Sequence, residues 1–171
     1  ETRFSKGMTK PDFELEQVLL DRGHFRIAGV DEVGRGPLAG PVVAAAVILN
    51  PQAIPEGLND SKKLTARRRV ALDAEIRHSA EFAVAEASVA EIDEINILRA
   101  SHLAMVRAVE TLSPAPDFLL IDGNMIPRDL KIPSQAVVKG DARSVSIAAA
   151  SILAKNWRDH WMADFTQQHP G

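Results

Sequence analysis

Residues 29–41 read Gly-Val-Asp-Glu-Val-Gly-Arg-Gly-Pro-Leu-Ala-Gly-Pro, and the interpretation of the chain starts from them. Asp31 and Glu32 end an apolar strand, where one of two successive side chains would face the interior. An unpaired buried carboxylate is costly, and two adjacent carboxylates repel each other unless a cation compensates them. Hard oxygen ligands favour a divalent metal ion, and the glycines let backbone N–H groups approach a ligand. The stretch therefore predicts a metal site beside a phosphate-rich ligand.

The rest of the chain alternates between strand-like and helix-like patterns. We expect strands at residues 25–30, 42–49, 82–89, 118–121 and 136–138, and helices at residues 13–20, 65–78, 92–113 and 144–165. Thr65 is the expected cap of the second helix. Early strands followed by strands that alternate with helices favour an α/β fold, a mixed central sheet flanked by helices. We expect a lead that is flexible over residues 1–11 and carries one short helix within residues 1–24, and a catalytic domain over residues 25–171.

The composition limits the classes of protein that fit. The chain has 171 residues, 46% of them hydrophobic and 25% charged, which suits one globular domain. It has no cysteine, which excludes disulfides, thiolate zinc sites and cysteine nucleophiles. The net charge is −3, so a nucleic-acid surface would have to be a local patch. Without an apolar run of about 18 residues or a signal-peptide core, we expect a cytoplasmic protein with no membrane contact.

Carboxylates follow three of the predicted strands. Asp122 and Asp141 each have a neighbouring glycine and come after the last two strands, as Asp31 and Glu32 come after the first. Open α/β sheets assemble their sites at the carboxyl ends of strands, so we expect these side chains to converge. Carboxylates without His or Cys suit Mg²⁺ or Mn²⁺ rather than Zn²⁺, and two such ions support phosphodiester hydrolysis. Taken singly, Asp141 is also explained as a helix N-cap, and Asp122-Gly123 and Asp31-Glu32 as ordinary turns.

The glycine-rich stretch has a rival interpretation as a nucleotide-binding loop. Its glycines at positions 34, 36 and 40 partly match a dinucleotide fingerprint, which requires a helix to follow. Pro37 and Pro41 interrupt the loop and a strand follows it instead. No Lys-Ser or Lys-Thr pair closes it as in a P-loop. Both nucleotide interpretations are rejected.

A basic run begins with residues 59–64, which include Ser61, Lys62 and Lys63, and continues through residues 67–69. One interpretation is a solvated helix face, and the other is a clamp on phosphates at a helix start. Ser151 and Lys155 lie four residues apart on the last helix and share a face. The histidines are scattered without ligand spacing, and the two tryptophans, at residues 157 and 161, are better explained by packing than by base stacking.

Several motifs in order resemble those of the bacterial type 2 ribonuclease H family, ribonuclease HII. They cover most of residues 25–170, and they are found at residues 29–41, 60–64, 91–97, 121–124, 139–141 and 149–155. The resemblance implies a ribonuclease H-like fold with four catalytic, metal-binding carboxylates, at Asp31, Glu32, Asp122 and Asp141. It also implies that Gly34-Arg35-Gly36 senses the 2′-hydroxyl of a ribonucleotide. The expected substrate-binding residues are Gly34, Arg35, Gly36, Ser61, Lys62, Lys63, Asn96, Ser151 and Lys155.

The resemblance further implies an activity. The expected enzyme hydrolyses the RNA strand of RNA–DNA hybrids and cuts on the 5′ side of single ribonucleotides in duplex DNA. The products would carry 3′-hydroxyl and 5′-phosphate ends, and the role would be removal of ribonucleotides from DNA. Family members continue into a segment with a Gly-Tyr motif, whose tyrosine is associated with recognising the RNA-to-DNA junction. The chain contains no tyrosine, and we expect this tail to be missing and junction selectivity to be reduced.

Two other functions compete with this one. Another ribonuclease H-like phosphoryl-transfer enzyme, such as a resolvase, would not need the Gly34-Arg35-Gly36 loop beside the acidic pair. A non-catalytic module that binds hybrids would keep the basic residues but would have no use for four carboxylates, which repel phosphates. The nuclease remains the leading hypothesis, with RNA–DNA hybrid and ribonucleotide-containing DNA as partners and a monomer as the expected state.

Overall fold

The structure is a computed structural model that describes residues 10–36 and 40–168 of the chain. Most of the expected N-terminal lead, over residues 1–11, lies outside this described part. So do residues 37–39 of the glycine-rich loop and residues 169–171.

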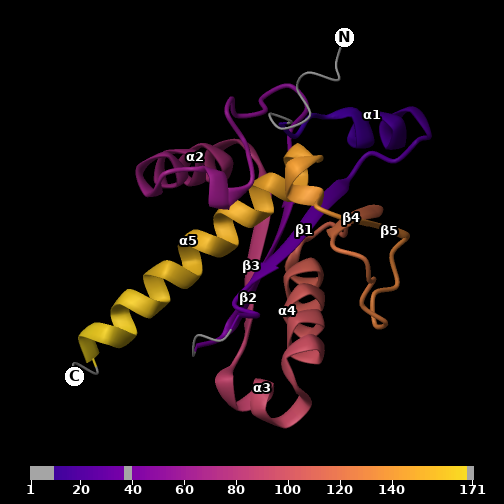
Figure 1. Cartoon of the computed structure of the whole chain (residues 1–171). Helices are drawn as coiled ribbons and strands as arrows, with labels where there is room; N and C mark the ends of the chain where they lie inside the picture. Colours follow the sequence, from indigo (N-terminus) through magenta and orange to yellow (C-terminus); the bar gives the residue numbers. More distant parts are fainter. Residues whose placement is uncertain (1–9, 37–39, 169–171) are drawn as a thin grey trace.

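A mixed sheet of five strands lies at the centre of the fold, in the order β3-β2-β1-β4-β5 (Figure 1). The strands are β1 (Ile27–Val33), β2 (Val42–Ile48), β3 (Glu81–Ala87), β4 (Phe118–Asp122) and β5 (Ser134–Val137). The first three pair in antiparallel fashion, whereas β4 runs parallel to β1 and β5 parallel to β4. The predicted fold class, a mixed sheet flanked by helices, is confirmed.

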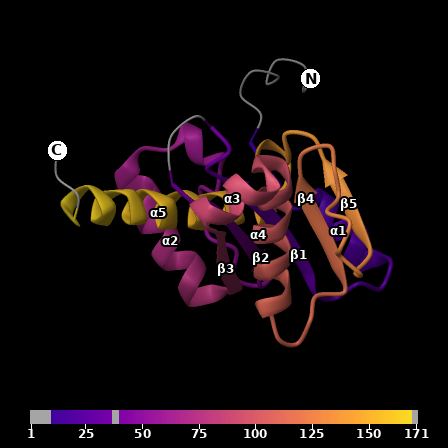
Figure 2. The ribbon, with the colours of Figure 1, turned by 90° about the horizontal axis from the view of Figure 1, so that it is seen from below.

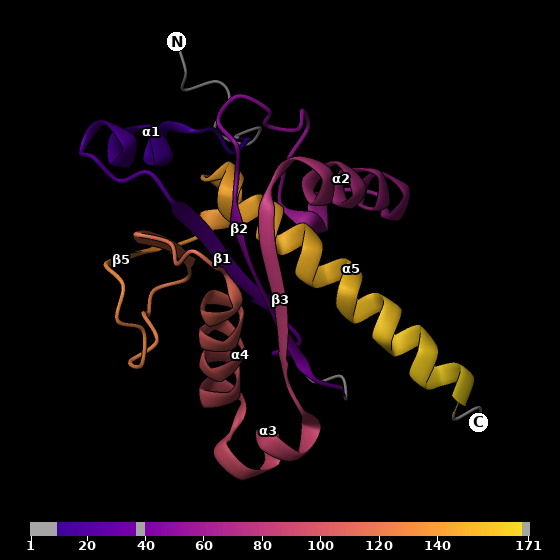
Figure 3. The ribbon, with the colours of Figure 1, turned by 180° about the vertical axis from the view of Figure 1, so that it is seen from behind.

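Helices cover both faces of this sheet. They are α1 (Glu14–Asp21), α2 (Ala66–Ser79), α3 (Val89–Ile95), α4 (Ile97–Thr111) and α5 (Val145–Gln168), with short 3₁₀ helices η2 (Ser61–Lys63) and η3 (Gly140–Ala142). α2 and α5 lie together, away from α4 (Figures 2 and 3). Side chains of β2 alternate between a core with α4 and a core with α2 and α5. Burial on both faces explains why residues 42–48 are continuously apolar.

The expected helix over residues 92–113 is wrong in one respect, because the chain forms two helices there. α3 begins with a capping box between Ser88 and Glu91 and ends at Asn96, whose φ is 74°. The left-handed backbone at Asn96 interrupts the helix, and its side chain accepts a hydrogen bond from the Arg99 N–H at 3.0 Å, which starts α4. Thr65 caps α2 as predicted, through a bond from the Arg68 N–H.

Several strand boundaries also differ from the expectation by one to three residues, and those of β1 and β5 bear on the site. β1 continues to Val33, so Asp31 and Glu32 lie inside the strand rather than after it. The reason is that β2 pairs with β1 as far as Val33, while β4 pairs with it only as far as Val30. β5 begins at Ser134, two residues earlier than expected, because it pairs with β4 from Leu119 onward.

α1 packs on the same face of the sheet as α5. Its Leu19 joins a cluster with Ile27, Leu120, Val137 and Ile147, which come from β1, β4, β5 and α5. Figures 1 and 3 show α1 beside the start of α5. This contact places the N-terminal helix directly behind the segment that carries Asp141.

Candidate metal centre

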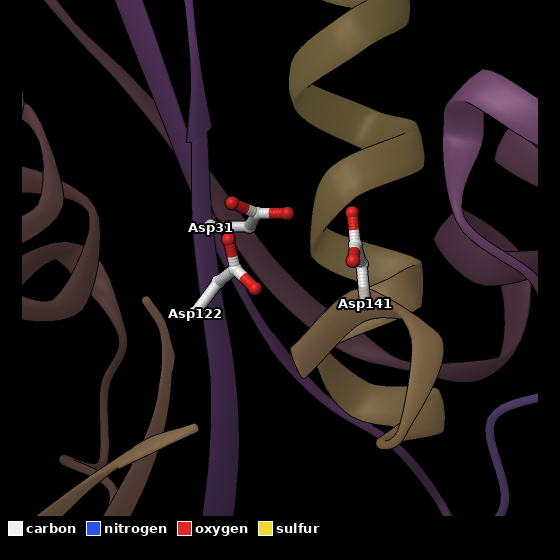
Figure 4. A group of neighbouring side chains, drawn as sticks. All are labelled: Asp31, Asp122 and Asp141. Carbon is white, nitrogen blue, oxygen red and sulfur yellow. The ribbon is translucent and has the colours of Figure 1, made fainter. Parts of the chain in front are cut away.

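Three aspartates converge at the edge of the sheet where β1 and β4 end. We call Asp31 of β1, Asp122 of β4 and Asp141 of η3 the carboxylate triad; one oxygen from each lies within 4.8 Å of the others (Figure 4). Asp31 and Asp122 are neighbours because Val30 pairs with Ile121 in the parallel ladder, one residue earlier. The alternation of side chains along a strand turns both aspartates toward the face of the sheet that α5 covers, and Asp141, in η3 just before α5, lies on that face.

Backbone hydrogen bonds fix two of these carboxylates. The N–H of Gly140 donates to Asp122 Oδ1 at 2.7 Å, and the N–H of Glu32 donates to Asp31 Oδ1 at 2.8 Å. A Cβ at Gly140 would lie 2.5 Å from Ile147 Cδ1 and 3.2 Å from Asp122 Oδ1. Glycine is therefore required for the close approach of η3 to β4.

A second glycine brings α5 onto the sheet. A Cβ at Gly29 would overlap the backbone of Ser146 and Ile147, so the first turn of α5 rests directly on the backbone of β1. Asp141 precedes this turn by only a few residues. It does not cap α5, because the N–H of Ile147 bonds instead to the hydroxyl of Ser144 at 3.1 Å. The alternative interpretation of Asp141 as the helix cap is therefore excluded.

The triad is electrostatically unfavourable as it stands. Asp31 is 4% exposed, and burial, followed by the charges of Asp122, Glu32 and Asp141, raises its pKa well above the usual value. Burial and the charge of Asp122 raise the pKa of Asp141 to about 6. Oxygen ligands without nitrogen or sulfur are those that hard divalent cations prefer. A bound cation would compensate the charges that these pKa values report.

Glu32 lies beside the triad but does not belong to it. As the residue after Asp31 in β1, it projects to the opposite side of the strand. Burial raises its pKa to about 7, the charge of Arg35 opposes that shift, and the charge of Asp122 adds to it. Glu32 is thus within electrostatic reach of both the triad and the glycine-rich loop.

Asp60 is a neighbour of the triad that the sequence analysis missed. Its carboxylate accepts a bond from the Lys62 N–H at 2.9 Å, and its charge and a hydrogen bond contribute to the raised pKa of Asp141. The charge of Lys62 lowers that same pKa, so η2 lies next to η3. The signal in the sequence that could have identified Asp60 is that it is the single acidic residue in the basic run, near its start.

The basic run divides into two parts. Lys62 and Lys63 are exposed on η2. Arg68 and Arg69 instead donate to backbone carbonyls of their own region, Arg68 to Glu56 at 2.9 Å and Arg69 to Leu64 at 2.9 Å. These two arginines therefore secure the loop before α2, and the part open to a ligand is the two lysines together with the exposed Arg67.

The other expected substrate-binding residues occupy varied environments. Ser61 and Ser151 are 3% and 2% exposed, and the Ser151 hydroxyl donates to the Ser61 hydroxyl at 2.8 Å, which joins η2 to α5. Lys155 forms an ion pair with Asp159 at 2.9 Å. Asn96 is exposed, and its side-chain oxygen caps α4.

The glycine-rich loop contains two different kinds of glycine. Gly34 has a φ of 101°, and a Cβ there would lie 2.7 Å from both the Pro41 carbonyl oxygen and Arg158 Nε. Among the described residues, none has an atom within 4 Å of the position that a Cβ at Gly36 would take, and Arg35 between the two glycines is exposed. Gly34 is thus required by the fold, whereas the surroundings of Gly36 leave room for a ligand.

The fold and the acidic edge of the sheet define a class of nuclease-like α/β enzymes, and solved structures of this class superpose on the chain. A ribonuclease H2 from Pyrococcus horikoshii OT3 superposes with a TM-score of 0.74 and 28% identity, over 85% of this chain and 77% of that one. Ribonuclease HII from Ruegeria pomeroyi is 70% identical over 167 residues, which is 98% of this chain and 71% of the relative. Ribonuclease HII from Ruegeria sp. strain TM1040 is 68% identical over 98% of this chain and 73% of its own length.

The model of the family described as ribonuclease HII matches residues 28–171. The chain belongs to the ribonuclease HII family. It is accordingly a ribonuclease H, a hydrolase with endoribonuclease activity on RNA–DNA.

Proposed function

We propose that the ribonuclease activity depends on divalent metal and uses Asp31, Glu32, Asp122 and Asp141 as its catalytic, metal-binding residues. The observation that carries this proposal is the carboxylate triad, three acids from separate elements with oxygens within 4.8 Å. A protein gains nothing in stability from burying repelling carboxylates, and a divalent cation would offset both the burial and the repulsion.

Mg²⁺ or Mn²⁺ suits this set of oxygen donors, in a two-metal reaction. Held by these carboxylates, such ions would supply activation of a water molecule and stabilisation of the departing oxygen. The chain itself orients these ligands. The N–H of Gly140 holds the carboxylate of Asp122, and the N–H of Glu32 holds that of Asp31. Glu32, with a pKa of about 7, contributes a fourth carboxylate from the other side of β1.

The substrate contacts we propose are made by the glycine-rich loop, by η2 and by residues of α4 and α5. Gly36 leaves space for a sugar, and backbone amides of the loop at Gly34 and Gly36 are suited to a 2′-hydroxyl, the group that distinguishes RNA from DNA. Arg35, Lys62 and Lys63 are exposed and suited to phosphates. Asn96 and Lys155 extend the contact surface, and the buried pair Ser61 and Ser151 supports it by fixing η2 on α5.

The proposed substrates are the RNA strand of RNA–DNA hybrids and duplex DNA with single embedded ribonucleotides. Cleavage of the latter occurs on the 5′ side of the ribonucleotide. The products carry 3′-hydroxyl and 5′-phosphate ends, because water and not the neighbouring 2′-hydroxyl is the nucleophile. The cellular role that follows is removal of ribonucleotides from DNA.

Cleavage of end-labelled duplexes tests the proposal. One duplex contains an all-RNA strand and the other a single ribonucleotide, and each is incubated with Mg²⁺, Mn²⁺, Ca²⁺ or excess chelator. We expect cleavage with Mg²⁺ or Mn²⁺ and none with Ca²⁺ or chelator, with product ends identified by ligation and phosphatase treatment. Full activity in excess chelator would exclude the metal-dependent mechanism.

Two expectations about the setting of the protein stay predictions. Size-exclusion chromatography with light scattering tests the expected monomer, and cell fractionation tests the expected cytoplasmic location. Within residues 10–36 and 40–168, no helix combines the length and apolar character needed to cross a membrane.

A further inference from the structure

Glu16 is a buried acid in α1 that the proposed mechanism does not use. It is 1% exposed, and within the described residues it has no ion pair with a lysine, arginine or histidine. Its Oε2 accepts bonds from the Ser144 hydroxyl at 2.7 Å and from the Ser146 N–H at 3.0 Å. Its Oε1 has no hydrogen-bond partner in the described structure. Because an unsatisfied buried acceptor is unfavourable, Glu16 calls for an explanation other than stability alone.

The bonds of Glu16 are the first links of a chain that leads to the triad. Ser144 also donates its backbone N–H to the carbonyl oxygen of Gly140 at 2.7 Å. Gly140 in turn donates its N–H to Asp122 Oδ1 at 2.7 Å. Ser144 and Gly140 lie on the two sides of Asp141 in the sequence. The chain of bonds therefore brackets one member of the triad and ends on another.

The backbone next to Glu16 holds the same junction. Asp12 forms an isolated parallel bridge with Ser144, in which its N–H donates to the Arg143 carbonyl at 3.2 Å and its carbonyl accepts from the Val145 N–H at 3.0 Å. α1 lies beside the start of α5, drawn in orange, in Figures 1 and 3. The segment around Glu16 thus reaches η3 and α5 at the point where Asp141 projects toward Asp31 and Asp122 (Figure 4).

We propose that Glu16 is a positioning residue for the metal centre, which holds Asp141 in place through Ser144. This inference rests on the proposed function, since it concerns the metal affinity of that same site. The family match begins at residue 28, so the supporting acid lies outside it. Groups that orient metal ligands from behind commonly affect metal affinity or activity by about 10- to 100-fold when removed.

The test compares substitutions in α1 that differ in whether they touch this chain of bonds. Glu16→Ala removes the acceptor. Glu16→Gln keeps an oxygen in its place and adds an amide N–H₂ where Oε1 has no partner. Leu19→Ala is the matched control, because Leu19 is a buried residue of the same helix and packs in the cluster with Ile147 without contacting Ser144 through a hydrogen bond. Each protein is checked for folding by thermal unfolding before use.

Mn²⁺ affinity is measured by calorimetry on the full chain without nucleic acid, and kcat and KM on a labelled RNA–DNA hybrid at saturating Mn²⁺. We expect Glu16→Ala to weaken Mn²⁺ binding by about tenfold or more and to lower kcat, with KM within about twofold of wild type. Glu16→Gln restores the affinity, and Leu19→Ala lowers the unfolding temperature while retaining it. Wild-type Mn²⁺ affinity in Glu16→Ala, or an equal loss in Leu19→Ala, would overturn the positioning role.

If Glu16→Ala does not fold, Ser144→Ala replaces it, since that substitution removes the hydroxyl bond between Glu16 and Ser144 through which the positioning is proposed to act, and unchanged Mn²⁺ affinity there would equally overturn the inference. Failure of the proposed function gives a different result. In that case the wild-type chain itself does not bind Mn²⁺ or cleave the hybrid, whatever residue 16 is.

Discussion

The aspartates of the carboxylate triad and the lysines of η2 differ in how the protein holds them. The triad lies on β1, β4 and η3. Backbone N–H groups fix Asp31 and Asp122, and burial and repulsion raise the pKa values of Asp31 and Asp141. Lys62 and Lys63 are exposed on a short 3₁₀ helix. The comparison indicates that the fold fixes the triad, the centre of the site, despite unfavourable electrostatics. Lys62 and Lys63, which we call the rim of the site, remain free to change conformation. Substitutions should therefore act on chemistry at the centre and on affinity at the rim.

The largest effect is expected at the centre. Asp122→Asn keeps an oxygen that can accept the Gly140 N–H but removes a charge from the triad. We expect kcat at saturating Mn²⁺ to fall by at least about a hundredfold, because several kcal/mol of transition-state stabilisation are lost. The unfolding temperature in chelator should stay the same or rise as repulsion falls. Turnover close to wild type would remove Asp122 from the catalytic set.

A smaller effect is expected in the glycine-rich loop. Gly36→Ala places a methyl group that meets no atom of the described residues within 4 Å, so we expect the fold to be unaffected and a loss of activity to report on the ligand. We expect cleavage at a single ribonucleotide to fall by about 10- to 100-fold, since a misplacement of about 1 Å can have that cost. Mn²⁺ affinity should not change.

Gly34→Ala makes an informative comparison with Gly36→Ala. Its positive φ and its contacts with Pro41 and Arg158 predict a lower unfolding temperature as well as lower activity. An unimpaired Gly36→Ala enzyme would mean that residue 36 does not lie against the 2′-hydroxyl.

At the rim, Lys63→Ala should weaken binding to hybrid and to plain duplex DNA alike, by about threefold to tenfold, because a phosphate contact carries no base information. The slope of log affinity against log salt should become shallower by about one. Filter binding at several salt concentrations measures both quantities, with Arg22→Ala on the exposed end of α1 as a control of equal charge. If the slope is unchanged, Lys63 belongs to a solvated surface. Lys62→Ala should behave similarly but also disturb Asp141, whose pKa the lysine lowers.

The same comparison explains what could be predicted from the sequence. The mixed sheet follows from local apolar patterns, and the position of Asp31 and Asp122 on adjacent strands follows from the sheet. The hydrogen bond between Ser61 and Ser151 joins residues 90 positions apart, and the bond between Glu16 and Ser144 joins residues 128 positions apart. A periodic pattern in a short stretch of sequence cannot predict contacts between residues so far apart. They depend on how closely α5 approaches β1 at Gly29, which is a property of tertiary packing.

The break between α3 and α4 has a similar explanation. The spacing of apolar residues continues through Asn96, so periodicity alone predicts one helix. The left-handed backbone of Asn96 and its side-chain bond to the Arg99 N–H, however, start a new helix there and compete with continuation of α3. Asp60 was missed because its role depends on the proximity of η2 to η3, and the sequence indicates neither 3₁₀ helix.

The smallest expected effect concerns stability without metal, and its sign follows from the raised pKa values at the centre. The pKa of Glu32 is about 7 and that of Asp141 about 6, whereas carboxyl groups of an unfolded chain titrate near about 4. The folded state therefore binds protons more tightly than the unfolded state, and the stability associated with these groups is lost as pH rises through their folded pKa values. Glu91, whose pKa is lowered to about 2 by Arg107, has the opposite sign but exerts its effect below about pH 5.

In chelator, the unfolding temperature should thus fall by a few degrees, on the order of 3 °C, between pH 5 and pH 8. Mn²⁺ should reverse the trend, because it competes with protons for the same carboxylates and stabilises the ionised centre more strongly at pH 8 than at pH 5. Scanning calorimetry at four pH values, with and without Mn²⁺, measures both curves. Asp141→Asn should flatten the curve in chelator, and Glu91→Gln should leave it unchanged over this range. A stability in chelator that rises from pH 5 to pH 8 would show that the carboxylates are not strained by one another, and that only the exposed rim, and not the centre, responds to charge.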